Sequence, residues 1–292
     1  MVYALTHQVL SDYIDMLLHL TNGYFSFVDN LYISDMNNNR VRKIAASTSV
    51  ISTYAGSGSG GYSGDNGLAT SAAISSPVGV AIDSSGNIYI GDASNHRVRK
   101  VTASTSTITT LAGTGIAGYS GDGGQATAAK LRLPSGINLD GRLNVYFGDY
   151  VSYNIIRKIT VSTGIISTVA GTGSTTGGYS GDNIQATAAM LNSPTDVLVD
   201  SYNNLYICDA YNNRVRKVDA STGVITTIVG DGTSSSIGDG SAASSATVIS
   251  PCYSRFDSVG NYYISECDGN RVRKVMIVTT DIPTAAPSYT PR

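Results

Sequence analysis

The stretch Asn87-Ile-Tyr-Ile-Gly-Asp92 recurs along the whole chain, each time followed by a basic stretch like Arg97-Val-Arg-Lys-Val101. Close variants begin at Asn30, Asn144, Asn204 and Asn261, so successive copies start 57, 57, 60 and 57 residues apart. A period of this length indicates one supersecondary unit that is repeated five times. A residue present in every copy serves the structure that all copies share, so the most conspicuous residues are predicted to have structural roles.

Each copy predicts four short antiparallel strands. In the copy around Asn87, β-branched and aromatic residues concentrate in four segments separated by turn residues, namely 78–83, 88–92, 97–102 and 107–111. Four such strands repeated radially are typical of a β-propeller blade. A parallel β-helix has much shorter coils, and no segment keeps helical spacing over several turns. The fold is therefore predicted to be all-β, a propeller of about five four-stranded blades.

The turn between the first two strands of each copy has a defined chemistry. Asp83 can accept hydrogen bonds from the turn amides, and Gly86 can adopt a positive φ. Asn203 and Gly260 occupy the same position as Gly86 and tolerate that conformation, whereas Leu143 does not. A rearranged turn is therefore expected at Leu143.

Long glycine-rich connectors separate the copies, as in Gly118-Tyr-Ser-Gly-Asp-Gly-Gly-Gln-Ala-Thr-Ala-Ala-Lys-Leu131. The Gly-Asp step suits a tight turn, and the alanine-rich part suits one helical turn whose Leu or Ile fills the space between blades. Together with the strands, these connectors closely resemble the NHL-repeat family of propellers over residues 23–278. The resemblance implies a disc of blades around a central channel, but no single activity, because relatives include binding modules, RNA readers and a metal-dependent lyase.

Composition indicates a turn-rich β protein with a neutral polar surface. The chain has 32 Gly, 19 Tyr and no Trp, and only 14% of its residues are charged, against about 25% in average soluble domains. Its formal net charge of −2 provides no global field for nucleic acid or an anionic membrane. No apolar run approaches the length of a membrane span.

Fourteen of the 19 basic residues lie in the Arg-x-Arg-Lys strands, which raises the possibility of nucleic-acid binding. The favoured alternative is a structural ion pair within each blade, because an acid ends every preceding strand and Arg binds carboxylates bidentately. The predicted pairs are Asp35 with Arg40, Asp92 with Arg97, Asp149 with Arg157, Asp209 with Arg214 and Glu266 with Arg271. In the second copy, either Arg97 or Arg99 could pair with Asp92. Alternation of side chains cannot bury both Val98 and Val101 on one face, which leaves the register of this strand unexplained.

No metal, cofactor or catalytic site is predicted. Each connector offers one aspartate (Asp65, Asp122 or Asp182), whereas a calcium loop requires several carboxylates at close spacing. The glycine-rich stretches lack the lysine of a phosphate-binding loop. His96 occupies a position held by Asn in other copies, which favours a bond to backbone; His7 and His19 lie in the degenerate N-terminus. The lyase of the family needs a histidine cluster that this chain lacks.

A disulfide is predicted between Cys252 and Cys267, with Cys208 reduced. The two cysteines are nearly equidistant from the hairpin turn of the last copy, so they would face each other across two strands. Three independent small core residues remain the alternative.

The ends of the chain depart from the repeat. Residues 1–22 are assigned to a degenerate N-terminal segment without the basic start of a signal peptide, and residues 23–280 to the propeller. Residues 276–280 follow the last Arg-x-Arg-Lys motif without a turn, so the last blade is expected to lack its fourth strand. Residues 2–6 or another copy could supply that strand. Residues 281–292 read as a Pro-, Ser- and Thr-rich tail that could carry O-linked sugars at Thr284, Ser288 and Thr290.

The sequence thus favours a non-enzymatic extracellular or cell-surface module that binds itself or other protein and glycan partners. The tail, the neutral surface and the lack of a catalytic set support this hypothesis. The second hypothesis is an intracellular NHL module that binds RNA or protein. The third is an enzyme of lyase or lactonase type acting at the channel.

Overall fold

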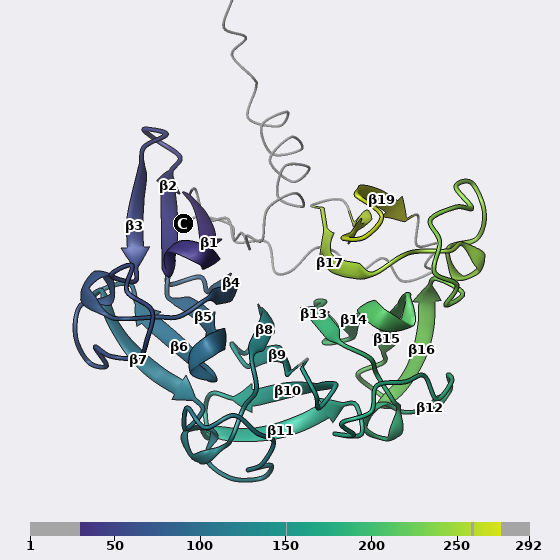
Figure 1. The fold of residues 1–292 in the computed structure, drawn as a ribbon, viewed down its shortest axis with the longest axis horizontal. Coiled ribbons are helices and arrows are strands. Elements are labelled where there is room, and N and C mark those ends of the chain that lie inside the picture. Colours follow the sequence, from purple (N-terminus) through teal and green to yellow (C-terminus); the bar gives the residue numbers. More distant parts are fainter. Residues whose placement is uncertain (1–29, 150, 258–259, 276–292) are drawn as a thin grey trace, which may run out of the picture.

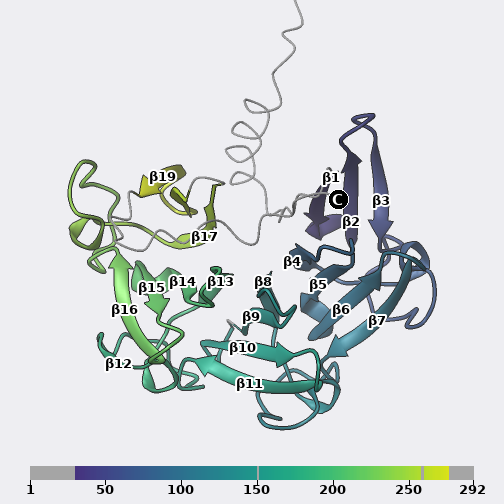
Figure 2. The same ribbon diagram turned by 180° about the vertical axis from the view of Figure 1, so that it is seen from behind.

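The computed structural model describes residues 30–149, 151–257 and 260–275, which form five antiparallel sheets around a common axis (Figure 1). The reverse view in Figure 2 shows the same arrangement, with β4, β8, β13 and β17 toward the axis and β3, β7, β11 and β16 at the rim. All helices among the described residues are 3₁₀ turns of three residues. The predicted all-β propeller is confirmed, with one sheet, called a blade, for each copy.

The blades are numbered in chain order, and the strands within each blade pair in sequence order. Blade 1 contains β1 (Asn30–Asp35), β2 (Arg40–Ala45) and β3 (Ile51–Ala55), and blade 2 contains β4 (Pro77–Ile82), β5 (Ile88–Asp92), β6 (Arg97–Thr102) and β7 (Thr107–Ala112). Blade 3 contains β8 (Pro134–Leu139), β9 (Val145–Asp149), β10 (Ile155–Thr160) and β11 (Ile165–Ala170). Blade 4 contains β13 (Pro194–Val199), β14 (Leu205–Asp209), β15 (Arg214–Val218) and β16 (Val224–Val229), with β12 (Ile184–Gln185) at its outer edge. Blade 5 contains β17 (Pro251–Phe256), β18 (Tyr262–Glu266) and β19 (Arg271–Val275).

Blades 2 to 4 have the predicted four strands, and blades 1 and 5 show three strands over the described residues. The last blade is predicted to lack its fourth strand because residues 276–280 follow without a turn, and these residues lie outside the described ones. So do residues 2–6, the boundaries at residues 22 and 280, and the tail with Thr284, Ser288 and Thr290.

Both faces of blades 2 to 4 are buried, because each face packs against a neighbouring blade. Val98 belongs to the apolar cluster between blades 2 and 3, and Val101 to the cluster between blades 1 and 2. Their relative exposures are 0% and 1%. The two valines therefore lie on opposite faces of β6 and are both core residues, which resolves the register that the sequence left unexplained.

The hairpin turns have the predicted chemistry. Asp83 Oδ1 accepts the N–H groups of Ser85 and Asn87 at 2.9 Å, and Gly86 has a φ of 79°. The rearrangement expected at Leu143 is wrong: this residue adopts a φ of 64° and donates its N–H to Asp140 O at 2.9 Å. The repeated Asp and Asn hydrogen bonds hold the turn in shape and impose the left-handed conformation on leucine.

The strand that ends at the acidic residue of each blade presents one tyrosine at an equivalent position. Its ring lies beneath the lysine that pairs with it across the strands, with Nζ 5.2–5.9 Å from the ring centroid. Such contacts stabilise a desolvated aromatic ring. The five pairs are Tyr32–Lys43, Tyr89–Lys100, Tyr146–Lys158, Tyr206–Lys217 and Tyr263–Lys274.

The connectors link neighbouring blades and cover sheet edges. Their alanine-rich parts form the short helical turns η2 (Ala69–Ser71), η4 (Ala126–Ala128), η5 (Ala186–Ala188) and η7 (Ala243–Ser245). A branched residue after each turn is buried between blades, as predicted: Ile74, Leu131, Leu191 and Val248. Each connector before blades 2 to 4 also bonds the outer strand of the blade that follows it, as Asn66 does to Ile108 O. These contacts cover edges that would otherwise offer a template for pairing.

Candidate functional site

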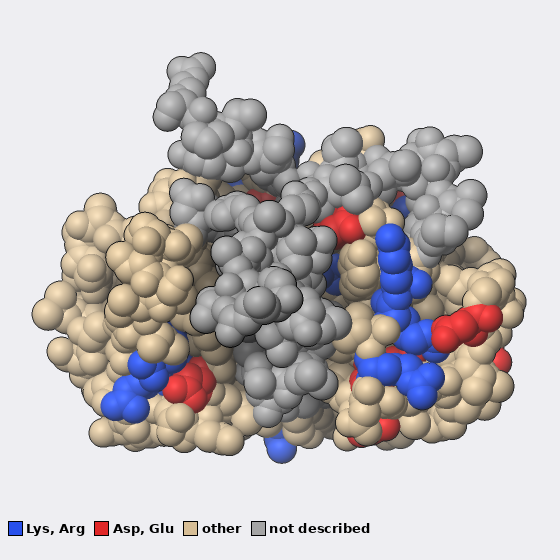
Figure 3. All heavy atoms as spheres, turned by 90° about the horizontal axis from the view of Figure 1, so that it is seen from above, with Lys and Arg blue, Asp and Glu red and all other residues tan. Residues whose placement is uncertain are grey.

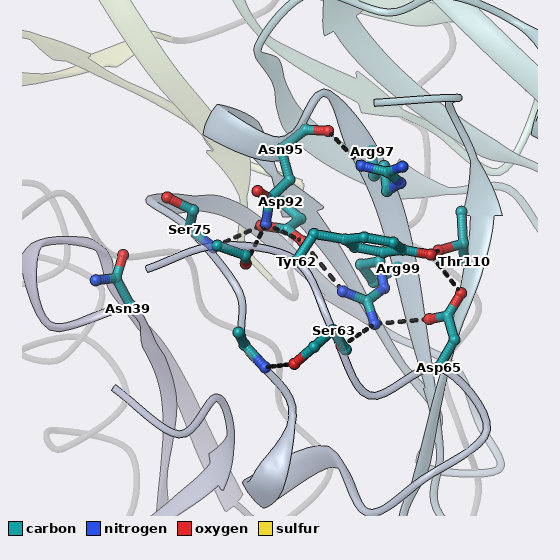
Figure 4. A network of polar contacts seen from close by, with 12 residues as sticks. Asn39, Tyr62, Ser63, Asp65, Ser75, Asp92, Asn95, Arg97, Arg99 and Thr110 are labelled. Atoms are coloured by element: carbon teal, nitrogen blue, oxygen red, sulfur yellow. Dashed lines mark hydrogen bonds and ion pairs between the residues drawn. The ribbon is translucent and has the colours of Figure 1, made fainter. Parts of the chain in front are cut away.

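The arginine that directly precedes the lysine of each basic strand is fully buried in blades 2 to 4. Arg99 is fully buried, and its Nη1 is 3.2 Å from Asp92 Oδ2 while its Nη2 is 2.6 Å from Asp65 Oδ1 (Figure 4). Its guanidinium also donates to Ser63 O at 3.2 Å. A buried guanidinium needs such compensation, because an uncompensated buried charge is strongly unfavourable.

The same arrangement recurs around the disc with small changes. The corresponding contacts are Arg42–Asp35 at 3.7 Å, Arg157–Asp149 at 3.9 Å, Arg216–Asp209 at 3.4 Å and Arg273–Glu266 at 3.0 Å. A connector aspartate makes the second contact in blades 3 to 5: Asp122, Asp182 and Asp239. The connector carboxylates are thus occupied by arginine, and no group of three or more possible metal-ligating side chains gathers anywhere in the described part of the chain.

The first arginine differs from the prediction, because it bonds backbone rather than the acid. Arg97 donates to Asn95 O at 3.1 Å and to Thr114 O at 2.7 Å, and its Cζ lies 3.6 Å from the centroid of the Tyr62 ring. It sits at the end of its strand, where free carbonyls are within reach, whereas Arg99 lies one pleat deeper. Arg40, Arg214 and Arg271 also donate to backbone carbonyls. Of the arginines predicted to pair with the strand-end acids, Arg157 does so, and in the second copy the alternative Arg99 pairs with Asp92.

His96 takes the place of the asparagines in other copies, as predicted. Its φ is 53°, and its Nδ1 accepts the N–H of Leu133 at 3.3 Å. Asn39 and Asn213 accept Ser76 and Ser250 N–H groups in the same way. The ring therefore fastens one blade to the next; His7 and His19 lie outside the described residues.

A polar cluster that is not repeated lies between the inner strands of blades 4 and 5. Asp196 stands where the corresponding strands have Gly79 and Gly136, and its relative exposure is 0%. Its Oδ2 accepts the N–H of Ser254 at 3.0 Å and Arg255 Nη1 at 2.9 Å. Gly136 makes room for this residue, since a Cβ there would lie 2.7 Å from Asp196 Cα. Sequence reasoning missed Asp196, although comparing it with its glycine counterparts would have revealed it.

The remaining members of this cluster are buried and unsuited to nucleophilic chemistry. Ser254 Oγ and Tyr262 OH have no hydrogen-bond partner among the described residues, and neither has Asp196 Oδ1. Burial raises the pKa of the Cys208 thiol far above its ordinary value, so the sulfur stays protonated and is a poor nucleophile. Burial also raises the pKa of Asp196, while the Arg255 charge opposes that shift. The cluster therefore fastens blade 5 to blade 4.

The cysteines have the predicted arrangement. Cys252 in β17 and Cys267, which follows β18, are joined in a disulfide with a Cα–Cα distance of 5.9 Å, and Cys208 is a buried free thiol. In addition, no helix within the described ranges is long and apolar enough to cross a membrane.

Comparisons with known proteins agree with this architecture. The family model of the teneurin NHL domain matches residues 115–288, well over half of the chain, and that of the NHL repeat matches residues 75–101. The chain is 29% identical over 226 residues to Teneurin-1 of Gallus gallus, a match that covers 67% of this chain and 8% of the relative. It is 32% identical over 102 residues to Protein SUPPRESSOR OF QUENCHING 1, chloroplastic, of Arabidopsis thaliana, covering 35% of this chain and 9% of that protein. The chain thus spans less than a tenth of the length of these curated relatives.

Solved structures share the fold at low identity. An auxiliary nutrient binding protein from Bacteroides thetaiotaomicron has a TM-score of 0.59 at 17% identity, covering 84% of this chain and 56% of that one. A nidogen/laminin complex has a TM-score of 0.57 at 16% identity, with coverages of 86% and 73%. A streptogramin B lyase has a TM-score of 0.50 at 13% identity, with coverages of 89% and 69%. From the family match and the five blades together, the chain belongs to the family of the teneurin NHL domain.

Proposed function

We propose that the chain is a non-enzymatic extracellular propeller module that binds protein or glycan partners, with self-association as one form of this binding. The observation that carries the proposal is the internal use of the repeated arginines. Arg99, Arg157 and Arg216 are fully buried against carboxylates, so these three arginines of the motif that suggested nucleic-acid binding are not available to a phosphate backbone.

The visible surface agrees with a neutral binding module. In Figure 3 the Lys and Arg side chains that undescribed residues leave uncovered form separate groups, with acidic side chains beside them. Phosphate binding would require a continuous basic surface. The non-repeated acid Asp196 is enclosed and paired, so it does not support an enzyme at the channel.

The disulfide and the tail composition support an extracellular location. Disulfides persist in oxidising compartments and are rare in the cytosol. Alkylation of the denatured protein before and after reduction should show one free thiol and then three. Three free thiols without reduction would remove this support.

The proposed function is tested with the full chain coupled to fluorescent beads. We expect the beads to aggregate or to bind protein and glycan surfaces, with no retention of RNA on filters at 50 or 200 mM salt. RNA retention that falls steeply between these salt concentrations would favour the intracellular RNA-binding hypothesis instead. Beads that neither aggregate nor bind any protein or glycan surface would refute the proposal.

A further inference from the structure

The connector before blade 4 departs from its counterparts in one respect. In the two preceding connectors the tyrosine hydroxyl bonds the connector aspartate and a threonine of the outer strand: Tyr62 with Asp65 and Thr110, and Tyr119 with Asp122 and Thr168. At the third connector, Thr227 donates directly to Asp182 Oδ1 at 3.0 Å. The Tyr179 hydroxyl has no hydrogen-bond partner over the ranges that the structure describes.

A shallow pocket that is largely open to solvent lies beside Tyr179. Its volume is about 240 Å³, and its lining comprises Tyr179, Asp182, Arg214, Thr227, Gly230, Asp231 and Ser244. That volume corresponds to roughly eight water molecules at about 30 Å³ each, which is the size of a single small ring. It is below the usual range of pockets for drug-sized ligands, about 300–1,000 Å³.

One wall of the pocket is an additional carboxylate. Asp231 is exposed and stands where the other copies have Ser57, Thr114 and Thr172. Its Oδ1 accepts the Thr233 N–H at 2.7 Å, which fixes the side chain at the rim. The tyrosine without a partner and the additional carboxylate therefore occur at the same position in the disc.

The lining of the pocket carries two carboxylates, Asp182 and Asp231, and one guanidinium, that of Arg214, which donates to Asp231 O at 2.5 Å. Behind the lining, the buried Arg216 is shared between Asp182 at 2.9 Å and Asp209 at 3.4 Å. These charges disfavour an anion, and the charged groups of the lining provide strong acceptors and donors for neutral hydroxyl groups.

We propose that this pocket binds one neutral sugar ring, such as the terminal residue of a glycan. Arg214 and Arg216 lie 3.9 and 4.8 Å from the Tyr179 ring centroid. The part of the Tyr179 side chain that stays exposed, 40% overall, would contact the apolar C–H side of the sugar. Asp231 and Asp182 accept sugar hydroxyl protons, and Arg214 and Ser244 donate to sugar oxygens. This inference deepens the proposed function, on which it rests for the class of partner.

The test is saturation-transfer NMR and calorimetry on the full chain with D-glucose, D-galactose, D-mannose and N-acetylglucosamine, each added alone. We expect at least one sugar to bind, and Asp231→Thr and Tyr179→Ala each to weaken it by about tenfold or more. The matched controls are Ser57→Thr and Tyr62→Ala, which alter the corresponding residues of the first connector and should leave the affinity unchanged. Melting curves establish that every variant is folded.

Several outcomes would overturn the inference. These are the absence of binding by all four sugars, equal weakening by the control variants, or binding confined to charged probes such as N-acetylneuraminic acid or glucosamine. The bead assay separates this inference from the proposed function. Loss of sugar binding in Asp231→Thr with bead aggregation retained supports the pocket and assigns adhesion to protein contacts. Sugar binding by wild type without any adhesion supports the pocket and refutes the proposed function.

Discussion

Each of blades 2 to 4 contains one buried arginine whose guanidinium lies between two acidic side chains. Arg99 and Arg97 are separated by one residue, yet the first is enclosed by carboxylates and the second reaches backbone carbonyls and a tyrosine ring. Equal chemistry in the sequence therefore serves two different roles, which substitution can separate.

Arg99→Leu should lower the free energy of unfolding by about 3–5 kcal/mol, because it leaves Asp92 buried without its partner. Arg97→Leu should cost about 1 kcal/mol, since a partly exposed side chain loses hydrogen bonds to backbone. Urea denaturation followed by circular dichroism measures both. Equal losses in the two variants would show that the assignment of roles is wrong.

Asp149 should make stability depend on pH. Burial raises its pKa to about 7, because its Oδ2 has no hydrogen-bond partner among the described residues and Arg157 is 3.9 Å away. The folded carboxyl then keeps a proton that the unfolded chain releases near pH 4. This group's contribution to the unfolding free energy therefore falls as pH rises from about 4 to 7, by at most about 1.4 kcal/mol per pH unit.

The measurement compares urea midpoints of wild type and Asp149→Asn at intervals between pH 4.5 and 7.5. Asp149→Asn should lack the fall in unfolding free energy that the Asp149 carboxyl causes as the pH rises. Asp209→Asn is the matched control, since burial raises the Asp209 pKa to about 6 and its window closes earlier. If the two variants change the slope between pH 6 and 7 equally, the distinction between the two acids fails.

At the scale of the element, the hairpin turns show how strongly repeated hydrogen bonds fix backbone shape. Leu143 is held at a positive φ that asparagine or glycine adopts with less strain. Leu143→Asn should therefore raise the free energy of unfolding by about 0.5–1 kcal/mol. The reciprocal Asn203→Leu in blade 4 should lower it by a similar amount. Thermal melts of both variants check this, and a destabilised Leu143→Asn would contradict it.

Strands, connectors and the turns other than that at Leu143 were predictable from the sequence, because each copy repeats the evidence for them. The choice between Arg97 and Arg99 was not, since it depends on which arginine lies deeper between blades. The pairing of Val98 and Val101 with different neighbours depends on both faces of the sheet being covered. Asp196 escaped notice for a related reason: its partners Ser254 and Arg255 come from another blade, and only assembly of the disc brings them together.

At the scale of the whole molecule, the outer edge of blade 5 is the place where a further strand could be added, from this chain or from a second copy. Over the described residues β19 has no outer neighbour, and strand edges are templates for pairing. Light scattering of the full chain should give a mass above that of the 30.4 kDa monomer, rising with concentration. A version without residues 1–20 should differ in mass or in melting temperature. A monomer in both cases with unchanged melting would show that the N-terminal segment completes nothing.

The connectors also determine where in the chain a repeat can be inserted or removed. A connector covers the outer strand of the blade after it. A connector and the following blade, for example residues 56–112, therefore form a segment whose outer strand is already covered. Removal of that segment leaves the outer strands β11 and β16 with their covers. A segment cut between connector and blade would separate a strand from its cover and expose an edge at each junction. Duplication, recombination and laboratory assembly of arrays should therefore succeed at the first of these boundaries and yield aggregating products at the second.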